Sequence, residues 1–378
     1  MRATNATGHS VLVAMWLSAA CEAGEGGTTD PGPDEGPDAE PIELPDLDVR
    51  YRTQYIDVAT FSDDPICAGT LALMDAHVEN LLGVLGLVLS RRLRLFHLHP
   101  EEPAPEEWCD DWFMNGASGS TGCYIPNDAI FTRNSSLPHE IVHAVTAEVG
   151  GSWWIEGVAE AFSNGFPSPT FAAGWSDFTR SRGYGLAHLV RWIVERYGGP
   201  AFMELYARTP LRADEATVDE AVREVLGVGF GELMNEYAVE SAFVYPSHWL
   251  CYIPPGAPEP PWDGDYWEHE VTFDCDAPST FSDSDFEHKR MTVRIPVTLP
   301  RTAPYRFLAD HSDAELSLQP CLPEPIMDPM VDTSAWPHPF DSSISDGTSI
   351  EAGPYVLFVS LPQGAPTTVR LVGYPSIH

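Results

Sequence analysis

Basic residues are scarce in this chain of 378 residues, and their scarcity excludes several classes of protein. Lys+Arg number 20 against Asp+Glu 56, so the formal net charge is −36 at pH 7. A surface of that charge repels phosphate backbones, and nucleic-acid binding is therefore not expected. Long apolar runs are also missing, because no stretch reaches the roughly 18 consecutive apolar residues that span a bilayer. A polytopic membrane protein is thus excluded.

Closely spaced cysteine pairs are absent as well, which argues against a zinc ribbon or a CxxC redox motif. The chain has 7 cysteines, at positions 21, 67, 109, 123, 251, 275 and 321. If Cys21 is set aside, an even number remains, which suits disulfides in an oxidising compartment. Sequence alone does not fix their pairing. The shortest loops would join Cys109 to Cys123 and Cys251 to Cys275, and these are the first pairs to test.

The N-terminal segment has the composition of an export signal. Residues 1–20 carry a single charge, Arg2, and an apolar run that is too short for a membrane span. The segment ends in Leu-Ser-Ala-Ala-Cys21, which resembles a bacterial lipobox and implies lipid attachment to Cys21. It departs from the lipobox pattern at Ser18, where an aliphatic residue is usual. Ordinary signal cleavage with a free Cys21 is the alternative.

An acidic stretch follows the signal. Residues 22–48 contain ten Asp or Glu side chains and no Lys or Arg, among many Gly and Pro. Such a composition cannot bury enough apolar surface to offset the entropy of ordering. We therefore expect a signal peptide with lipobox at 1–21 and a disordered tether at 22–49. This arrangement predicts export to the cell surface or outer membrane as a lipoprotein, or to the periplasm or exterior without lipid. The lipid anchor would be the sole membrane contact.

Hydrophobic patterning divides the rest of the chain in two. The first part alternates strand-like and helical patterns up to residue 245, whereas the second has only short strand-like runs between turns. We expect an α+β domain over residues 50–245 and an all-β sandwich over residues 246–378. The expected strands and helices of the first domain are strands at 51–62, 93–99 and 124–132, helices at 69–90 and 137–149, and mainly helix from there to 245.

Two local features carry weaker expectations. Thr217 followed by Glu220 has the spacing of a capping box, which predicts that a helix begins at Thr217. The acidic run 263–270 lacks the Asp/Asn-Gly spacing of an EF-hand loop, so we expect a solvated loop there rather than a calcium site.

The most informative stretch is Leu137-Pro-His-Glu-Ile-Val-His143. His139 and His143 are four residues apart on a predicted helix, so their imidazoles lie on one face, one turn apart, as two ligands of a tetrahedral metal require. Glu140 would face the open side of that metal, where a carboxylate can take the proton of a water molecule. The spacing therefore predicts a zinc site with a general base.

A second acidic motif, Trp153-Trp-Ile-Glu156-Gly-Val-Ala-Glu160, begins ten residues after His143. HExxH followed by W-x-x-E-G-x-A-E resembles the gluzincin peptidases, the thermolysin-like and aminopeptidase-like metallopeptidases. The resemblance implies a zincin-like fold with Glu156 as third metal ligand and Glu160 as the hydrogen-bond partner of a ligand histidine. The chain departs from gluzincins in its shorter gap before Glu156, and it lacks the N-E-x-x-S-D and G-x-M-E-N segments.

Metzincins fit less well, because Thr146 and Val149 stand where that group has Gly and its third His. Residues 184–240 resemble the tail of small bacterial gluzincin domains, in which a Tyr region lies over the metal. This likeness implies that Tyr184, with His188 as the alternate, stabilises the oxyanion of the tetrahedral intermediate. The C-terminal part resembles the β-sandwich appended to secreted bacterial peptidases, and no active-site residue is expected there.

The sequence thus predicts an exported, lipid-anchored peptidase with one catalytic Zn²⁺ held by His139, His143 and Glu156. Glu140 would serve as general base, and peptides or proteins would be the substrates. The alternative is a zincin-fold surface lipoprotein without turnover that binds protein or polysaccharide. Retention of Glu140 argues against that alternative, because an inactive site has no need of the base.

Overall fold

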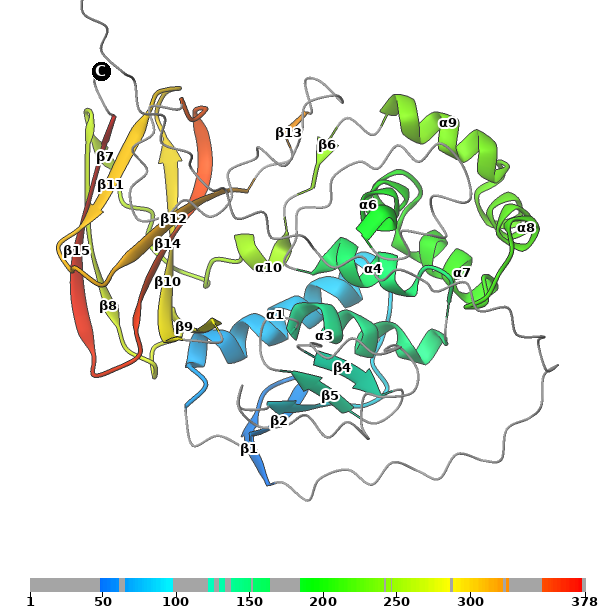
Figure 1. Cartoon of the computed structure of the whole chain (residues 1–378), viewed down its shortest axis with the longest axis horizontal. Helices are drawn as coiled ribbons and strands as arrows, with labels where there is room; N and C mark the ends of the chain where they lie inside the picture. Colours follow the sequence, from blue (N-terminus) through cyan, green and yellow to red (C-terminus); the bar gives the residue numbers. More distant parts are fainter. Residues whose placement is uncertain are drawn as a thin grey trace, which may run out of the picture. The chain divides into compact units, whose positions relative to one another are not determined.

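The computed structural model is a mixed α+β structure with one helical region and several antiparallel sheets (Figure 1). Cys21 and residues 22–47 of the expected tether lie outside the described residues, while Val49, its last residue, belongs to a strand. Two hydrophobic clusters form the core, one within the α+β part and one between the C-terminal sheets. The structure describes residues 48–60, 65–97, 122–125, 129–132, 137–150, 152–163, 184–240, 243–245, 247–285, 288–321, 324–325 and 349–375.

A five-stranded sheet with the order β1-β2-β3-β5-β4 underlies the first cluster. The three inner strands are parallel, and the edge strands β1 and β4 are antiparallel to their neighbours. All of β5 is buried, as expected for a parallel strand covered on both faces. The strands are β1 (Val49–Arg52), β2 (Ile56–Thr60), β3 (Leu93–His97), β4 (Gly122–Ile125) and β5 (Ala129–Thr132).

The single strand expected at 124–132 is wrong. The chain reverses between β4 and β5, which pair as an antiparallel hairpin with Cys123 opposite Phe131. The sequence between the two strands, Pro126-Asn127-Asp128, consists of residue types typical of turns, a signal that the prediction of one strand overlooked.

Helix α1 (Ala68–Leu85) connects β2 to β3 and packs its apolar face, including Val78 and Leu81, into the first cluster. It is shorter than the expected helix at 69–90. Gly86 adopts φ 70° and its N–H bonds the carbonyl of Leu82, so a left-handed cap ends the helix. Val88, which fits the apolar stripe, is 83% exposed beyond that cap.

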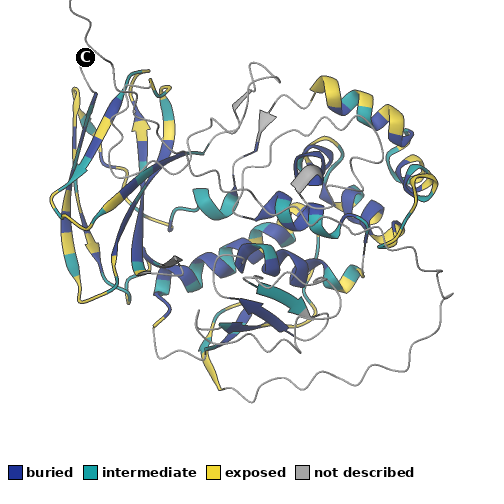
Figure 2. Cartoon of the chain, viewed as in Figure 1, coloured by how far each residue is buried: buried dark blue, intermediate teal, exposed yellow. Residues whose placement is uncertain are grey.

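The expectation of mainly helical structure from 137 to 245 is confirmed for the described residues. Figure 2 shows α1 and α3 mostly buried, whereas α8 and α9 expose much of their surface. Within the described part of the chain, no helix has both the length and the apolar character needed to cross a membrane. The helices are α3 (Leu137–Thr146), the 3₁₀ turn η1 (Ala147–Val149), α4 (Ile155–Phe162), α6 (Tyr184–Tyr197), α7 (Gly199–Arg208), α8 (Glu215–Leu226), α9 (Phe230–Glu240) and α10 (His248–Cys251).

Helix α8 begins earlier than the capping box predicts. Asp214 is its N-cap, accepting a hydrogen bond of 2.9 Å from the backbone N–H of Thr217. The Thr217 hydroxyl donates to the same carboxylate at 2.7 Å. Asp and Thr both suit an N-cap, and here the carboxylate three residues upstream takes the role.

Two four-stranded antiparallel sheets enclose the second cluster, compatible with the expected sandwich. The acidic run 263–270 is not the solvated loop we expected, since most of it lies in β8, where Trp267 and Val271 point into the core. The sheets have the orders β12-β14-β10-β9 and β11-β15-β8-β7, and β6 (Phe243–Val244) pairs with β13 (Glu324–Pro325). Their strands are β7 (Trp262–Asp263), β8 (Tyr266–Phe273), β9 (Thr280–Asp285), β10 (His288–Leu299), β11 (Tyr305–Ala309), β12 (Glu315–Pro320), β14 (Gly353–Pro362) and β15 (Thr367–Pro375).

Disulfides join Cys67 to Cys275 and Cys251 to Cys321. Cys251 therefore does not pair with Cys275, one of the two pairs that loop length put first for testing, because each cysteine finds its partner across the fold rather than along the chain. Cys123 is also disulfide-bonded, while Cys109 lies outside the described residues. Disulfides of this kind indicate an oxidising environment such as the periplasm or the cell exterior.

Candidate metal centre

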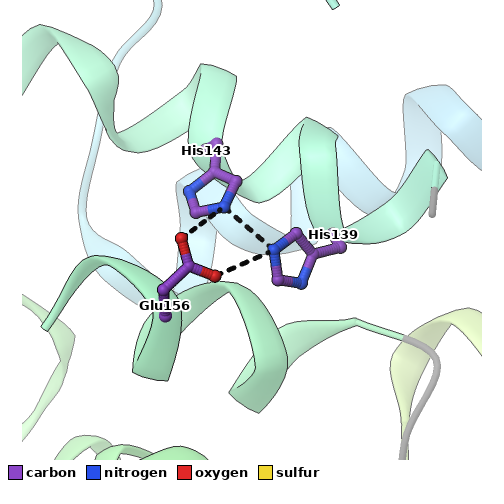
Figure 3. A group of neighbouring side chains, drawn as sticks. All are labelled: His139, His143 and Glu156. Carbon is purple, nitrogen blue, oxygen red and sulfur yellow. Dashed lines mark hydrogen bonds and ion pairs between the residues drawn. The ribbon is translucent and has the colours of Figure 1, made fainter. Parts of the chain in front are cut away.

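His139, His143 and Glu156 meet between α3 and α4 (Figure 3). The Nε2 atoms of the two histidines are 2.9 Å apart. The Glu156 carboxylate lies 3.3 Å from His139 Nε2 through Oε2 and 3.5 Å from His143 Nε2 through Oε1. All the ligand atoms fall within 4.8 Å of one another. The structure thus brings together the three residues that the sequence predicts as ligands.

Helix α3 places the two histidines by burying its other faces. Ile141 and Val142 have no exposed surface and belong to the first hydrophobic cluster. Near the end of the helix, the Thr146 hydroxyl donates to the carbonyl of Val142 at 3.0 Å. With the apolar faces fixed in the core, the face with His139 and His143 turns toward α4.

The start of α4 is fixed by the end of α7. Trp154 is fully buried, and its indole Nε1 donates to the hydroxyl of Thr209 at 3.3 Å. The backbone N–H of Trp153 donates to the Thr209 carbonyl at 3.2 Å, and Ser152 forms a β-bridge with Pro210. These contacts set the position of the first turn of α4, which carries Glu156.

Gly157 allows α4 to approach α6 closely. A Cβ at this position would lie 2.8 Å from Leu186 Cβ and 3.3 Å from Val190 Cγ2. Leu186 Cβ is bonded to the backbone and cannot turn aside. The glycine after Glu156 therefore has a packing role that the sequence motif alone did not explain.

Glu160 holds the first histidine from behind. Its Oε1 lies 3.1 Å from His139 Nδ1, while the other ring nitrogen of His139 faces Glu156. A carboxylate on the distal nitrogen fixes the tautomer and orientation of a ligand histidine. This contact matches the role that the resemblance implies for Glu160.

The charges in the site favour a cation. Burial lowers the pKa of His139, but hydrogen bonds to Glu156 and Glu160 outweigh burial and raise it to about 10. Burial likewise opposes the charge of Glu156, yet its contact with His139 keeps the pKa of that carboxyl lowered. Burial lowers the pKa of His143 to about 4, so this imidazole is a neutral electron-pair donor.

Glu140 is buried, with 6% of its surface exposed, beside the three candidate ligand residues. Burial raises the pKa of Glu140 to about 7; attraction by His139 opposes this, and repulsion by Glu156 and Glu160 adds to it. A carboxyl group with a pKa near neutrality can both accept and release a proton at physiological pH. This property is compatible with the general-base role that the sequence predicts for Glu140.

The donor set fits zinc. Two imidazoles and one carboxylate are a common catalytic set, which leaves one position for water. Ligand lengths of about 2.0 to 2.2 Å imply separations of roughly 3.3 to 3.6 Å between the ligand atoms of a tetrahedral site. The contacts from Glu156 Oε2 to His139 and from Glu156 Oε1 to His143, 3.3 and 3.5 Å, are of this size but come from different oxygens, and the 2.9 Å between the histidines is slightly short.

Tyr184 and His188 are the two candidates that the sequence offers for stabilising the oxyanion. Tyr184 is the first residue of α6, and its side chain is outside the described part of the structure. His188 has no exposed surface. Its Nδ1 lies 2.9 Å from the hydroxyl of Tyr237, and its ring packs against Tyr245. A fully buried imidazole cannot reach a substrate, which leaves Tyr184 as the candidate.

Sequence reasoning missed the surroundings of the centre. His77 of α1 is fully buried, and the carbonyl of Pro138, next to His139, partly stabilises its charged form. Burial raises the pKa of Tyr206 of α7 to about 12; the contact with Thr146 opposes this effect, and Glu156 adds to it. No local motif marks either residue, because each reaches the site from another helix.

In comparisons with known proteins, no protein-family model and no curated protein matches this chain.

Proposed function

We propose that the chain is a zinc-dependent peptidase with a zincin-like α+β domain. The single observation that carries this proposal is the convergence of His139, His143 and Glu156 within 4.8 Å of one another. These residues would hold one Zn²⁺. Such an ion supplies a Lewis acid that activates water and polarises the scissile carbonyl.

The residues of the chain supply the proton transfers and the geometry. Glu140 accepts a proton from the attacking water and delivers it to the leaving amine, a task suited to its raised pKa. Glu160 keeps Nε2 of His139 directed at Glu156 through its contact with Nδ1. Tyr184, at the start of α6, is proposed to donate a hydrogen bond to the oxyanion.

Peptides or proteins would be the substrates, and they would meet the enzyme outside the cytoplasm. The disulfides support export. A lipid on Cys21 is proposed to anchor the chain, with membrane contact through that lipid alone.

The test is metal content and hydrolysis by the purified full chain. Zinc per chain is measured by mass spectrometry, and hydrolysis with unstructured casein and peptide libraries. Wild type should hold one zinc and cleave. Glu140→Gln should keep the zinc but lose activity by about 10²- to 10⁴-fold, the usual contribution of a general base.

Glu156→Gln should lose both zinc and activity. Glu204→Gln, at an exposed position on α7, is the matched control and should behave as wild type. Stoichiometric zinc in a wild type as inert as Glu140→Gln would overturn the peptidase proposal in favour of a binding module. A wild type without zinc would overturn the metal assignment itself.

A further inference from the structure

Basic side chains gather at α10, where α1, α6 and β10 meet it. They are His77 of α1, Arg191 of α6, His248 of α10 and Arg294 of β10. Burial, and then repulsion by Arg191 and Arg294, lower the pKa of His248. Burial and His248 together lower the pKa of His77 to about 3. Such a gathering of basic side chains, of which Arg191 and Arg294 carry the charge, is unusual in a chain with Asp+Glu 56 and Lys+Arg 20.

Arg191 is oriented by aromatic rings rather than by an acid. Its guanidinium carbon lies 4.8 Å from the ring centroid of Phe162 and 5.3 Å from that of Tyr245. Glu195 attracts Arg191 without forming an ion pair with it. Among the described residues, Arg191 has no hydrogen-bond acceptor, and its Nε is fully buried. Since the rings engage its faces, the in-plane N–H groups are the donors left for a ligand.

His248 offers a second unused donor. Its Nδ1 is buried and has no hydrogen-bond partner within the described part of the chain. Its ring stacks on that of His77 at 6.1 Å, with 24° between the planes. His77 has no exposed surface, and neither of its ring nitrogens forms a hydrogen bond of normal geometry there. Buried polar groups in proteins nearly always have partners, so the unpaired Nε of Arg191 and Nδ1 of His248 together indicate a missing ligand.

The chemistry of these groups selects the ligand. A guanidinium fixed in one plane presents a fork of N–H groups that matches a carboxylate. One negative charge would offset the charge of Arg191 and favour protonation of His248, which can then donate as well. The neighbouring rings of Tyr245, Trp249 and Tyr252 suit a ligand with an apolar body. We propose that Arg191 and His248 form a binding site for one carboxylate group of an apolar organic acid or peptide.

The site does not depend on the proposed metal chemistry, and its test is direct binding to the full chain. 3-Phenylpropionate is the probe, with 3-phenylpropionamide and inorganic phosphate as comparisons. Binding is followed by the NMR signals of ¹⁵N-labelled arginine Nε–H groups and by Tm. Wild type should show a saturable shift of the Arg191 signal with the carboxylate and none with the amide.

Arg191→Gln should weaken binding at least tenfold. The control is Arg196→Gln. It removes an exposed arginine that lies on α6, like Arg191, and pairs with Glu240 of α9, and it should bind as wild type. If Arg191→Gln does not fold, His248→Gln gives the same test with the guanidinium retained. Equal binding of the amide, tighter binding of phosphate, or unchanged affinity in a folded variant of either residue overturns the proposal.

Two further experiments are needed. One identifies the source of the carboxylate, and the other distinguishes failure of this proposal from failure of the proposed function. The first arm distinguishes a terminal carboxylate from a side-chain carboxylate. It compares the binding of three peptides: one ending in phenylalanine with a free C-terminus, the same peptide amidated, and an amidated peptide with an internal glutamate. Glu156→Gln should bind 3-phenylpropionate as wild type although it cannot hold zinc. Loss of binding in Glu156→Gln would place the carboxylate at the metal centre and overturn the Arg191 site.

Discussion

Glu160 Oε1 lies 3.1 Å from His139 Nδ1, so His139, a proposed zinc ligand, is held at the nitrogen that faces away from Glu156. Removing the charge of Glu160 should leave the ligand set intact but reduce its affinity for metal. For Glu160→Gln we expect zinc affinity to fall by about 10- to 100-fold, the usual effect of losing such a partner. Competition with a chelating dye measures it. An unchanged affinity, as expected for the exposed control Glu204→Gln, would contradict the orienting role.

Gly157 tests the contact between α4 and α6. In Gly157→Ala the new methyl meets Leu186 Cβ at 2.8 Å, and we expect a loss of roughly 1 to 3 kcal/mol in the free energy of unfolding. Gly83→Ala is the matched control, since that glycine is helical and has nothing within 4 Å of the added Cβ. It should stabilise the protein by up to about 1 kcal/mol. Urea unfolding measures both, and equal effects would refute the packing role of Gly157.

His77 should make stability depend on pH. Its pKa falls from 6.5 to about 3 on folding, with burial as the main cause. Between these values the unfolded chain binds a proton that the folded chain does not, so the free energy of unfolding falls as pH falls. The slope from this one group approaches 1.4 kcal/mol per pH unit. Urea unfolding of wild type and His77→Gln at pH 7.5, 6 and 5 should show a difference that changes with pH. A constant difference would be the contrary result.

The disulfide between Cys251 and Cys321 closes a loop with a sequence separation of 70. In the chain-entropy account, such a link stabilises the folded state by about 4 kcal/mol. Replacing both cysteines by serine should lower the free energy of unfolding by up to that amount, measured in urea without reductant. Mass spectrometry of unreduced peptides should recover the Cys251–Cys321 pair, and recovery of Cys251 linked to Cys275 would contradict the structure.

The candidate metal ligands could be predicted from the sequence because they lie in short local motifs. His139 and His143 need only one helix, and its spacing fixes their common face. Glu156 and Glu160 lie on a second short helix, again four residues apart. The approach of the two helices was inferred from a family resemblance, and the distances between their side chains agree with it.

Features that depend on distant partners could not be predicted in this way. Asp214 rather than Thr217 caps α8, a choice between two suitable residues that the coordinates decide. Most of the acidic stretch 263–270 is strand because β8 pairs with β15, and Trp267, Val271 and Phe273 of β8 belong to the second core. Arg191 and His248 come together only when α6 and α10 pack in the folded chain, so no local sequence motif predicts their proximity.

The bond between Cys67 and Cys275 spans a sequence separation of 208 and ties the start of α1 to the end of β8. A single proteolytic nick anywhere between these two cysteines would leave both fragments covalently attached. After such damage the chain would thus keep its helices and its C-terminal sheets in one piece. The cut would become visible as two bands only after reduction on a gel.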